Sequence, residues 1–235
     1  MEQHLSKYYQ KNDILLREHA PGHLRFNVFD YLWLLLIHNG RQVGTQLSLF
    51  RNINKSIDYQ SLVFRFLTTR ENSIIMVQYP SNDISVGIID KDHILVEKNG
   101  RYTTQSLSAT LLSTTLFFPI RELVKQYVII MIKQNRVDQL KELVLLRDGE
   151  VQLIKDYTAG AVKSINGNII KKIDQVIDLI LSSRDRIEYN NKSGETININ
   201  TPVVRGIIKK NVKNSDNPFY LKKSTEQILT ELIKT

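Results

Sequence analysis

Apolar residues repeat with different periods along the chain, and these periods predict where helices and strands lie. Between residues 107 and 147 they recur every three or four positions, as on a helix with one buried face. Pro119 interrupts this run, so we expect two helices that meet at or just before Phe118. Residues 151–165 and 168–182 have the same period and predict two further helices.

A different pattern comes before the long helical run. Short β-prone segments separated by turn residues cover 73–79, 84–90, 93–98 and 101–105. Asn99-Gly100 stands between the last two, and Asn-Gly is a strong hairpin signal because a type I′ turn has positive φ at both positions. These segments predict an antiparallel meander of three or four strands. A second hairpin is expected from residues 187–189 and 196–199.

Two apolar segments lie in the first third of the chain. Residues 26–37 contain the sole tryptophan, Trp33, and predict a buried helix that ends at Asn39-Gly40. Residues 59–67 are apolar and aromatic, and their pattern is compatible with a helix or a strand. Neither 28–37, which is too short, nor 107–132, which contains charged residues, predicts a transmembrane helix.

Together these elements predict an α+β fold. Its centre is an antiparallel β-meander packed against several amphipathic helices, and a second small hairpin lies near the C-terminus. We expect residues 1–235 to form a single α+β unit. The alternative subdivision places the meander and its helices in 1–149, and the helical hairpin and basic C-terminal region in 150–235.

Composition restricts the chemistry. The chain has no cysteine, which excludes disulfides, cysteine-based zinc sites, iron–sulfur clusters and a cysteine nucleophile. The first 13 residues are polar and lack the apolar stretch of a secretory signal. We therefore expect a cytoplasmic protein.

Positive charge is concentrated towards the C-terminus. The net charge is +8; residues 154–235 carry 14 Lys and Arg against 9 Asp and Glu, and residues 1–153 carry 18 against 15. Cations bind phosphates, and aromatic rings among them can stack on bases. The candidate binding residues are Arg205, Lys209, Lys210, Lys213, Phe219, Tyr220, Lys222 and Lys223.

This cluster predicts a non-catalytic binding or assembly protein whose C-terminal surface contacts nucleic acid or an acidic protein partner. The plainer interpretation is a solvated edge, with Phe219 and Tyr220 packing inward. A further alternative is an adaptor or subunit that docks through the apolar segments 28–37 or 107–132, which would make the protein part of an oligomer or complex.

A metal-dependent nuclease is the enzyme worth considering. Asp83, Asp90, Asp92 and Glu97 lie on or beside predicted strands, and carboxylates on adjacent strands can hold Mg²⁺. However, Glu97 and Lys98 are neighbours and point to opposite faces of a strand, which breaks the nuclease pattern. Phosphate-loop, Gly-x-Ser-x-Gly and His-Glu-x-x-His motifs are absent. We expect no catalytic residues, no metal site and no cofactor.

Overall fold

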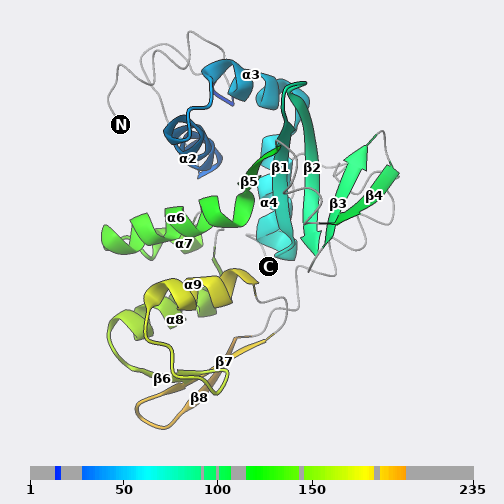
Figure 1. The fold of residues 1–235 in the computed structure, drawn as a ribbon. Helices are drawn as coiled ribbons and strands as arrows, with labels where there is room; N and C mark the ends of the chain where they lie inside the picture. Colours follow the sequence, from blue (N-terminus) through cyan, green and yellow to red (C-terminus); the bar gives the residue numbers. More distant parts are fainter. Residues whose placement is uncertain are drawn as a thin grey trace. The chain divides into compact units, whose positions relative to one another are not determined.

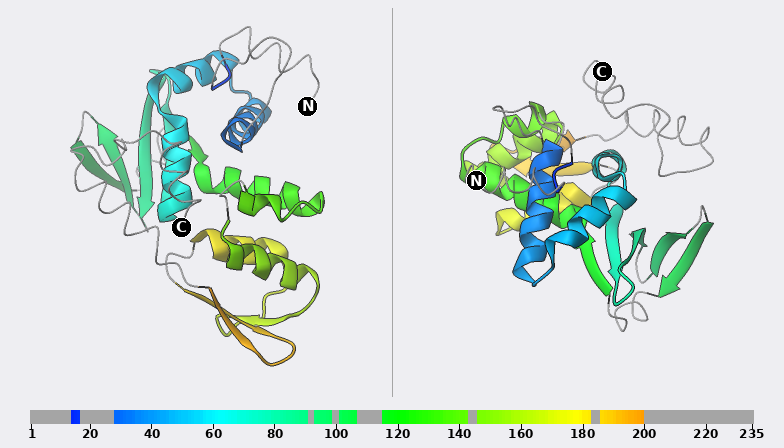
Figure 2. Two further views of the ribbon diagram at one scale, coloured as in Figure 1. Left: turned by 180° about the vertical axis from the view of Figure 1, so that it is seen from behind. Right: turned by 90° about the horizontal axis from the view of Figure 1, so that it is seen from above.

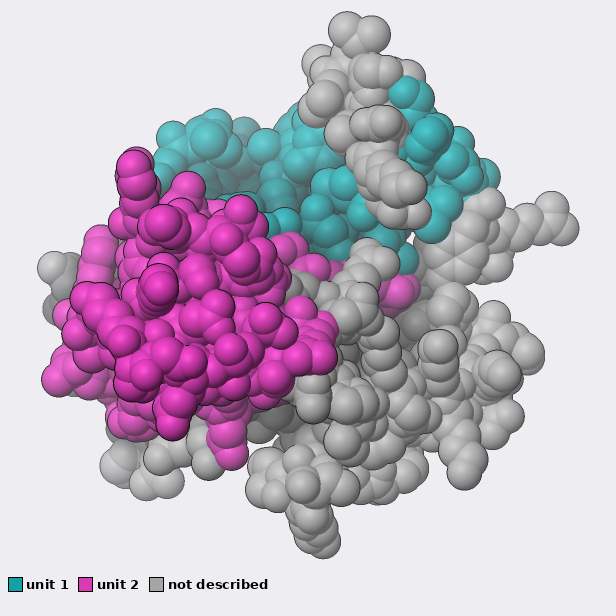
Figure 3. All heavy atoms as spheres, turned by 90° about the horizontal axis from the view of Figure 1, so that it is seen from below, with its two compact units in different colours: residues 1–63, 72–123 teal, residues 64–71, 124–235 magenta. Residues whose placement is uncertain are grey.

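The structure is a computed structural model. It describes residues 14–16, 28–90, 93–98, 101–106, 115–142, 146–182 and 186–199. The described chain divides into two compact units (Figure 3): unit 1 consists of residues 1–63 and 72–123, and unit 2 of residues 64–71 and 124–235. The fold class is α+β, with helices, a five-stranded antiparallel sheet and a C-terminal hairpin, as the sequence predicts.

The helices described in unit 1 (Figure 1) are α2 (Val28–Gln42), α3 (Leu47–Ser56) and α4 (Tyr59–Thr69), of which α4 continues into unit 2. Trp33 of α2 joins them. Its ring makes edge contacts with Phe50 of α3 at a centroid distance of 6.4 Å, and with Tyr59 of α4 at 4.9 Å. The indole Nε1–H donates to the carbonyl of Ile14 at 2.6 Å. Burial of these rings therefore holds α3 and the start of α4 in place.

The end of the first helix differs from the prediction. We expected Asn39-Gly40 to terminate it, whereas α2 continues to Gln42 and the chain turns at Gly44, whose φ is +84°. Gly40 is required for packing inside the helix. A Cβ at this position would lie 2.4 Å from the Phe50 ring. Gly40 therefore permits close approach of α3, and Gly44 supplies the left-handed conformation that ends the helix.

The sheet of unit 1 has the order β4-β3-β2-β1-β5. Four strands follow α4 as predicted: β1 (Asn72–Gln78), β2 (Asp83–Asp90), β3 (His93–Lys98) and β4 (Arg101–Ser106). Each pairs with the next in antiparallel register. Alternating residues from β1 and β3 form a core patch of Ile74, Met76, Ile94 and Val96. The predicted meander is confirmed.

The prediction for residues 115–119 is wrong. They form β5 (Thr115–Pro119), which pairs with β1 so that Phe118 lies opposite Ile75. A short apolar run has the same appearance whether it forms a buried helix or a strand, and pairing with β1 decides the outcome. Pro119 stands at the end of the strand, immediately before α6, where a missing N–H costs little.

Unit 2 contains most of α6 (Ile120–Lys133), together with α7 (Gln139–Glu142), α8 (Asp148–Thr158) and α9 (Ile173–Ser182). Its sheet has the order β6-β7-β8, formed by β6 (Val162–Ile165), β7 (Ile187–Asn191) and β8 (Thr196–Ile199). The predicted hairpin at 187–199 is confirmed. The predicted helix over 151–165 is wrong after Thr158, because Gly160 has a φ of +69° and the chain then joins the sheet as β6.

Candidate functional site

The C-terminal residues predicted to bind a partner are not part of the described structure. They are Arg205, Lys209, Lys210, Lys213, Phe219, Tyr220, Lys222 and Lys223, and they stay a prediction. The described residues contain a different candidate surface, built in unit 1 from α3, the start of α4 and the loop between β1 and β2.

A two-residue turn joins α3 to α4. Ile57 is extended, with φ of −133°, and directs the chain away from α3. Asp58 then caps the first turn of α4: its carboxylate accepts from the Ser61 N–H at 3.1 Å and from the Ser61 hydroxyl at 2.6 Å. In Figures 1 and 2, α3 runs across the start of α4. A helix–turn–helix is thus followed directly by the antiparallel hairpin of β1 and β2.

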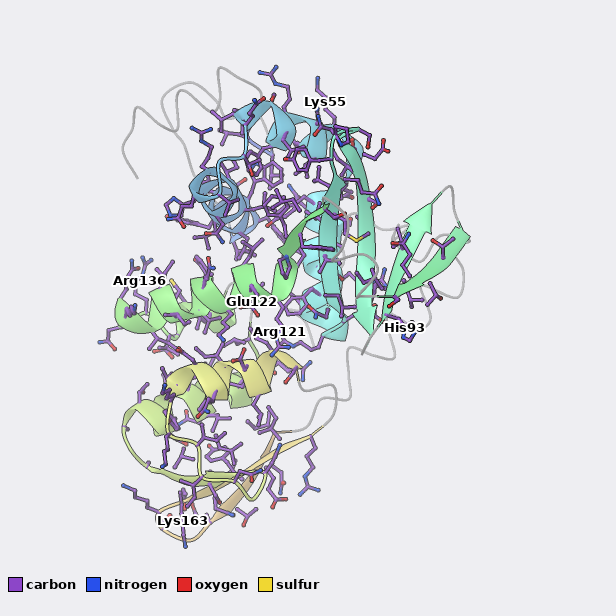
Figure 4. The ribbon with its side chains drawn as sticks, in the orientation of Figure 1. Lys55, His93, Arg121, Glu122, Arg136 and Lys163 are labelled. Atoms are coloured by element: carbon purple, nitrogen blue, oxygen red, sulfur yellow. The ribbon has the colours of Figure 1, made fainter. Side chains whose placement is uncertain are left out.

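Polar and basic side chains line the outer side of this arrangement. Lys55 and Asn52 are exposed on α3, and Lys55 is labelled in Figure 4. Gln60, in the first turn of α4, is half-buried. Within the described part of the chain, these three side chains make no hydrogen bond or ion pair. They are therefore available to an outside ligand.

A pocket of about 330 Å³ opens between the start of α3 and the β1–β2 loop. Its polar lining comes from Thr45, Gln46, Ser48 and Asn52 on one side, and from Tyr79 and Asn82 on the other. Tyr79 is 41% exposed, and Pro80 beside it follows a cis peptide bond. The pocket is lined by residues of unit 1 alone.

The start of α3 lies in this pocket without a side-chain cap. Gln46 occupies the cap position with φ of −73° and ψ of 146°, and its side chain makes no capping hydrogen bond. The N–H groups of a first helical turn have no acceptor within the helix, and they carry the positive end of the helix dipole. Of these groups, the Leu49 N–H already donates to the Gln46 carbonyl at 3.1 Å, and Ser48 lines the pocket.

Thr45 adds a polar side chain to the same wall. The residue is only 5% exposed. Its N–H donates to the Gly40 carbonyl at 2.9 Å, and its own carbonyl accepts from the Arg41 guanidinium at 3.1 Å. The hydroxyl has no hydrogen-bond partner among the described residues. The hydroxyl is not among the fully buried atoms that lack a partner, so it is open to solvent in the pocket.

Among the described residues, no group of three or more His, Asp and Glu side chains is placed to hold a metal ion. Asp90 and His93 face each other across β2 and β3 in the register, and Asp83 stands at the opposite end of β2. His38 contacts the Gln42 side chain at 3.0 Å on α2. Asp92 lies outside the described residues.

Of the two apolar segments considered as docking surfaces, 28–37 is mostly buried, whereas residues 107–114 lie outside the described residues and Ile130 of α6 is 37% exposed. In α2, Leu32, Trp33, Leu36 and Ile37 have no exposed surface, whereas Tyr31 is 46% exposed. Within the part of the chain that is described, no helix is both long and apolar enough to cross a membrane. Docking of these segments on a partner stays a prediction.

Sequence reasoning did not find the α3–α4 surface because residues 59–67 fitted a helix or a strand equally well. A usable signal was present: Asp58 precedes Tyr59 and stands three residues before Ser61, which is the spacing of a helix N-cap. With that assignment, two helices separated by a short turn and followed by a hairpin would have been expected. Comparisons of the chain with protein-family models, with curated proteins and with solved structures found no match.

Proposed function

We propose that the protein binds nucleic acid through the α3–α4 surface, with the basic C-terminal residues 205–223 adding electrostatic affinity. The observation that carries the proposal is the α3–α4 arrangement followed by the β1–β2 hairpin. In helix–turn–helix proteins the second helix enters the major groove of DNA and its N-terminal residues contact base edges. Here that helix is α4.

The chemistry of the surface supports this orientation. Gln60 lies in the first turn of α4 with a free side-chain amide, and a glutamine amide can pair with the edge of adenine in the major groove. Lys55 is a free cation on α3, next to the turn. Ser, Asn and Gln side chains and helix N-termini are common phosphate contacts, and all of them occur at the start of α3.

The net positive charge of the chain favours an anionic ligand. The net charge of +8 raises local concentrations of polyanions, and the excess is greatest after residue 153. A cytoplasmic location belongs to the proposal, because a cysteine-free chain needs no oxidising compartment. An acidic protein partner would use the same cations, and the choice of ligands in the experiment separates the two.

The test is a binding titration by fluorescence anisotropy. The full-length protein is titrated into a duplex of about 30 base pairs, the matching single strand and an RNA of the same length, at about 50 and about 200 mM salt. We expect the tightest binding to the duplex, with a clear loss at the higher salt. Lack of binding to every nucleic acid at the lower salt would overturn the proposal.

Matched charge reversals locate the contact. Lys55→Glu changes the charge on α3, and Lys163→Glu makes the same change at an exposed position of β6 in unit 2 (Figure 4). We expect Lys55→Glu to weaken duplex binding about tenfold, and Lys163→Glu to weaken it less than about threefold. Equal effects would place the contact elsewhere on the protein.

A further inference from the structure

We infer that the pocket between α3 and the β1–β2 loop takes an unpaired nucleobase of the bound nucleic acid. This inference rests on the proposed function and adds to it a contact that a fully paired duplex does not make. A base inside a duplex has both faces stacked and its pairing edge occupied, so only a flipped, bulged or terminal base can enter a pocket.

The lining of the pocket disfavours several classes of ligand. Its nine residues include no Asp, Glu or His to hold a metal ion, and no Lys or Arg to balance an anion. Six of the nine have polar side chains, so a purely apolar ligand fits poorly. A neutral molecule with hydrogen-bonding groups remains. The volume of about 330 Å³ is roughly ten times the share of one water in the liquid, so a base and several ordered waters fit.

Three of the lining residues carry side-chain amides. Gln46 and Asn52 belong to the α3 wall, and Asn82 belongs to the β1–β2 loop. Among the described residues, none of these three side chains makes a hydrogen bond or an ion pair. Each amide has both a donor and an acceptor, and the edge of a nucleobase presents donors and acceptors side by side. The amides can therefore pair with a base edge without any charge.

Tyr79 adds an aromatic face to the pocket. The residue is 41% exposed and lies in the β1–β2 loop beside Pro80, which also lines the pocket. Proteins that bind unpaired bases stack them on aromatic side chains and read their edges by hydrogen bonds. An aromatic ring and three amides around one recess supply both kinds of contact, and this combination points to a base.

Hydrogen bonds hold both walls of the pocket (Figure 1). In the β1–β2 loop, the Ser81 hydroxyl donates to the Gln78 carbonyl at 3.3 Å and accepts from the Asp83 N–H at 3.4 Å. On the other wall, the Arg41 guanidinium donates to the Thr45 carbonyl at 3.1 Å. Walls that are ordered before binding lower the entropy cost of holding a ligand, so the pocket is suited to a small planar group.

The test compares three duplexes by fluorescence anisotropy with the full-length protein. One is fully paired, one contains a single extra adenosine as a bulge, and one contains the same bulge without its base. We expect the bulged duplex to bind about tenfold more tightly than the paired one, and the abasic bulge to lose this preference, because the base is what stacks. The two bulged duplexes have the same number of phosphates, so their difference reports on the base alone.

Tyr79→Ala removes the aromatic face and should abolish most of the preference for the bulged duplex. Tyr79→Phe keeps the ring and should retain that preference. The matched control is Tyr31→Ala, the same change at a tyrosine of α2 that is 46% exposed and does not line the pocket. Its effect on the preference should stay below about twofold, as expected of a surface change away from the contact.

Asn52→Ala tests the hydrogen bonds. Asn52 is exposed on α3, and alanine is favoured in a helix, so the fold is retained. We expect the preference for the bulged duplex to fall about fivefold, because a hydrogen bond to the base is lost. Asn82 is left in place because its φ is +56°, a conformation that asparagine adopts more readily than alanine.

Nuclear magnetic resonance of the full chain gives a direct readout. Addition of the bulged duplex should shift the side-chain amide signals of Gln46 and Asn52, and the abasic duplex should leave them in place. If adenosine alone shifts these signals and the bulged duplex does not, the inference is overturned, because the pocket then takes a free small molecule rather than a base of nucleic acid.

The outcomes separate this inference from the proposed function. Equal affinity of the parent protein for all three duplexes would overturn the base site and leave the proposed function standing. An equal loss of preference in Tyr79→Ala and Tyr31→Ala would do the same. Failure of the parent protein to bind any nucleic acid would overturn both. Thermal unfolding shows that each variant is folded, and the abasic comparison needs no variant.

Discussion

Arg70 and Glu150 form an ion pair in which each side chain is only 2% exposed, with a nitrogen–oxygen distance of 3.0 Å. Arg70 directly follows α4 and has a φ of +56°. Glu150 belongs to the first turn of α8, where its carboxylate also accepts from the Arg147 N–H at 2.9 Å. The pair therefore joins two parts of unit 2 that are 80 residues apart in the chain.

Replacement of Glu150 by Gln removes the charge that compensates Arg70. A buried charge left without its partner is strongly destabilising, so we expect the free energy of unfolding to fall by about 3–5 kcal/mol. The comparison is Glu71→Gln, which breaks the Arg65–Glu71 pair, whose side chains are 16% and 32% exposed. That pair should contribute about 1 kcal/mol or less. Urea unfolding followed by circular dichroism measures both, and equal losses would contradict the expected difference.

Tyr59 and Tyr189 provide a matched pair of buried hydroxyls. Among the described residues the Tyr59 hydroxyl is buried without a hydrogen-bond partner, whereas the Tyr189 hydroxyl donates to Asp156 at 2.7 Å. We expect Tyr59→Phe to leave the free energy of unfolding unchanged or to raise it by up to about 2 kcal/mol. Tyr189→Phe should lower it by about 1–3 kcal/mol, because the acceptor is charged. Urea unfolding at neutral pH measures both changes, and a large loss in Tyr59→Phe would contradict this prediction.

The same residues predict instability at alkaline pH. Burial raises the pKa of Tyr59, and burial together with the Asp156 carboxylate raises that of Tyr189. The folded state therefore keeps protons that the unfolded state releases above about pH 10, and stability falls as pH rises beyond that point. Each tyrosine contributes a slope of up to about 1.4 kcal/mol per pH unit. Tyr59→Phe should flatten the decline of unfolding free energy between about pH 9.5 and 11.5, and an unchanged decline would contradict this assignment.

Gly40 of α2 lies against the Phe50 ring of α3. In Gly40→Ala the new Cβ would meet the Phe50 ring, and that ring is enclosed by Trp33 and Phe118. Alanine is favoured in a helix by about 1 kcal/mol, but overpacking costs about 1–3 kcal/mol, so we expect a net loss of about 1 kcal/mol. The fluorescence of Trp33, the sole tryptophan, reports on this region during urea unfolding. Gln42→Ala, an exposed change on the same helix, should stay within about 0.5 kcal/mol.

Local sequence patterns predicted the helices and strands whose formation depends mainly on their own residues. The meander was predictable because β-prone runs and turn residues alternate from Asn72 to Ser106. The strand at 115–119 was not, because its few apolar residues suit a helix equally well until β1 pairs with them. The role of Gly40 was equally hidden, because it depends on Phe50, which belongs to the next helix.

The candidate site brings together residues that lie far apart in the sequence, and no local sequence pattern predicts that they are neighbours. Thr45 and Asn82 line one pocket although they come from different parts of the chain, and this proximity is visible only after folding. The basic character of residues 205–223 was evident from composition alone. Composition therefore suggested a class of ligand, whereas the surface that we propose for it could be chosen only from the fold.

Two variants should distinguish preference for a DNA sequence from electrostatic affinity for any duplex. Gln60→Ala removes a side-chain amide from the first turn of α4, where base edges would be read. We expect it to reduce the difference in affinity between preferred and random duplexes by about tenfold, with the salt dependence unchanged, because no charge is lost. The combined change Lys209→Glu, Lys210→Glu and Lys213→Glu should do the reverse. It should weaken binding to all duplexes alike and reduce the salt slope.

Both variants are measured by competition binding against a pool of random duplexes at several salt concentrations. If Gln60→Ala weakens all duplexes equally, α4 does not read bases and contacts only the backbone. If the lysine reversals leave the salt slope unchanged, residues 205–223 make no phosphate contacts, and the electrostatic affinity arises from cations such as Lys55 on α3. The salt slope thus tests whether the C-terminal residues supply affinity, and the affinity difference between preferred and random duplexes tests whether α4 supplies specificity.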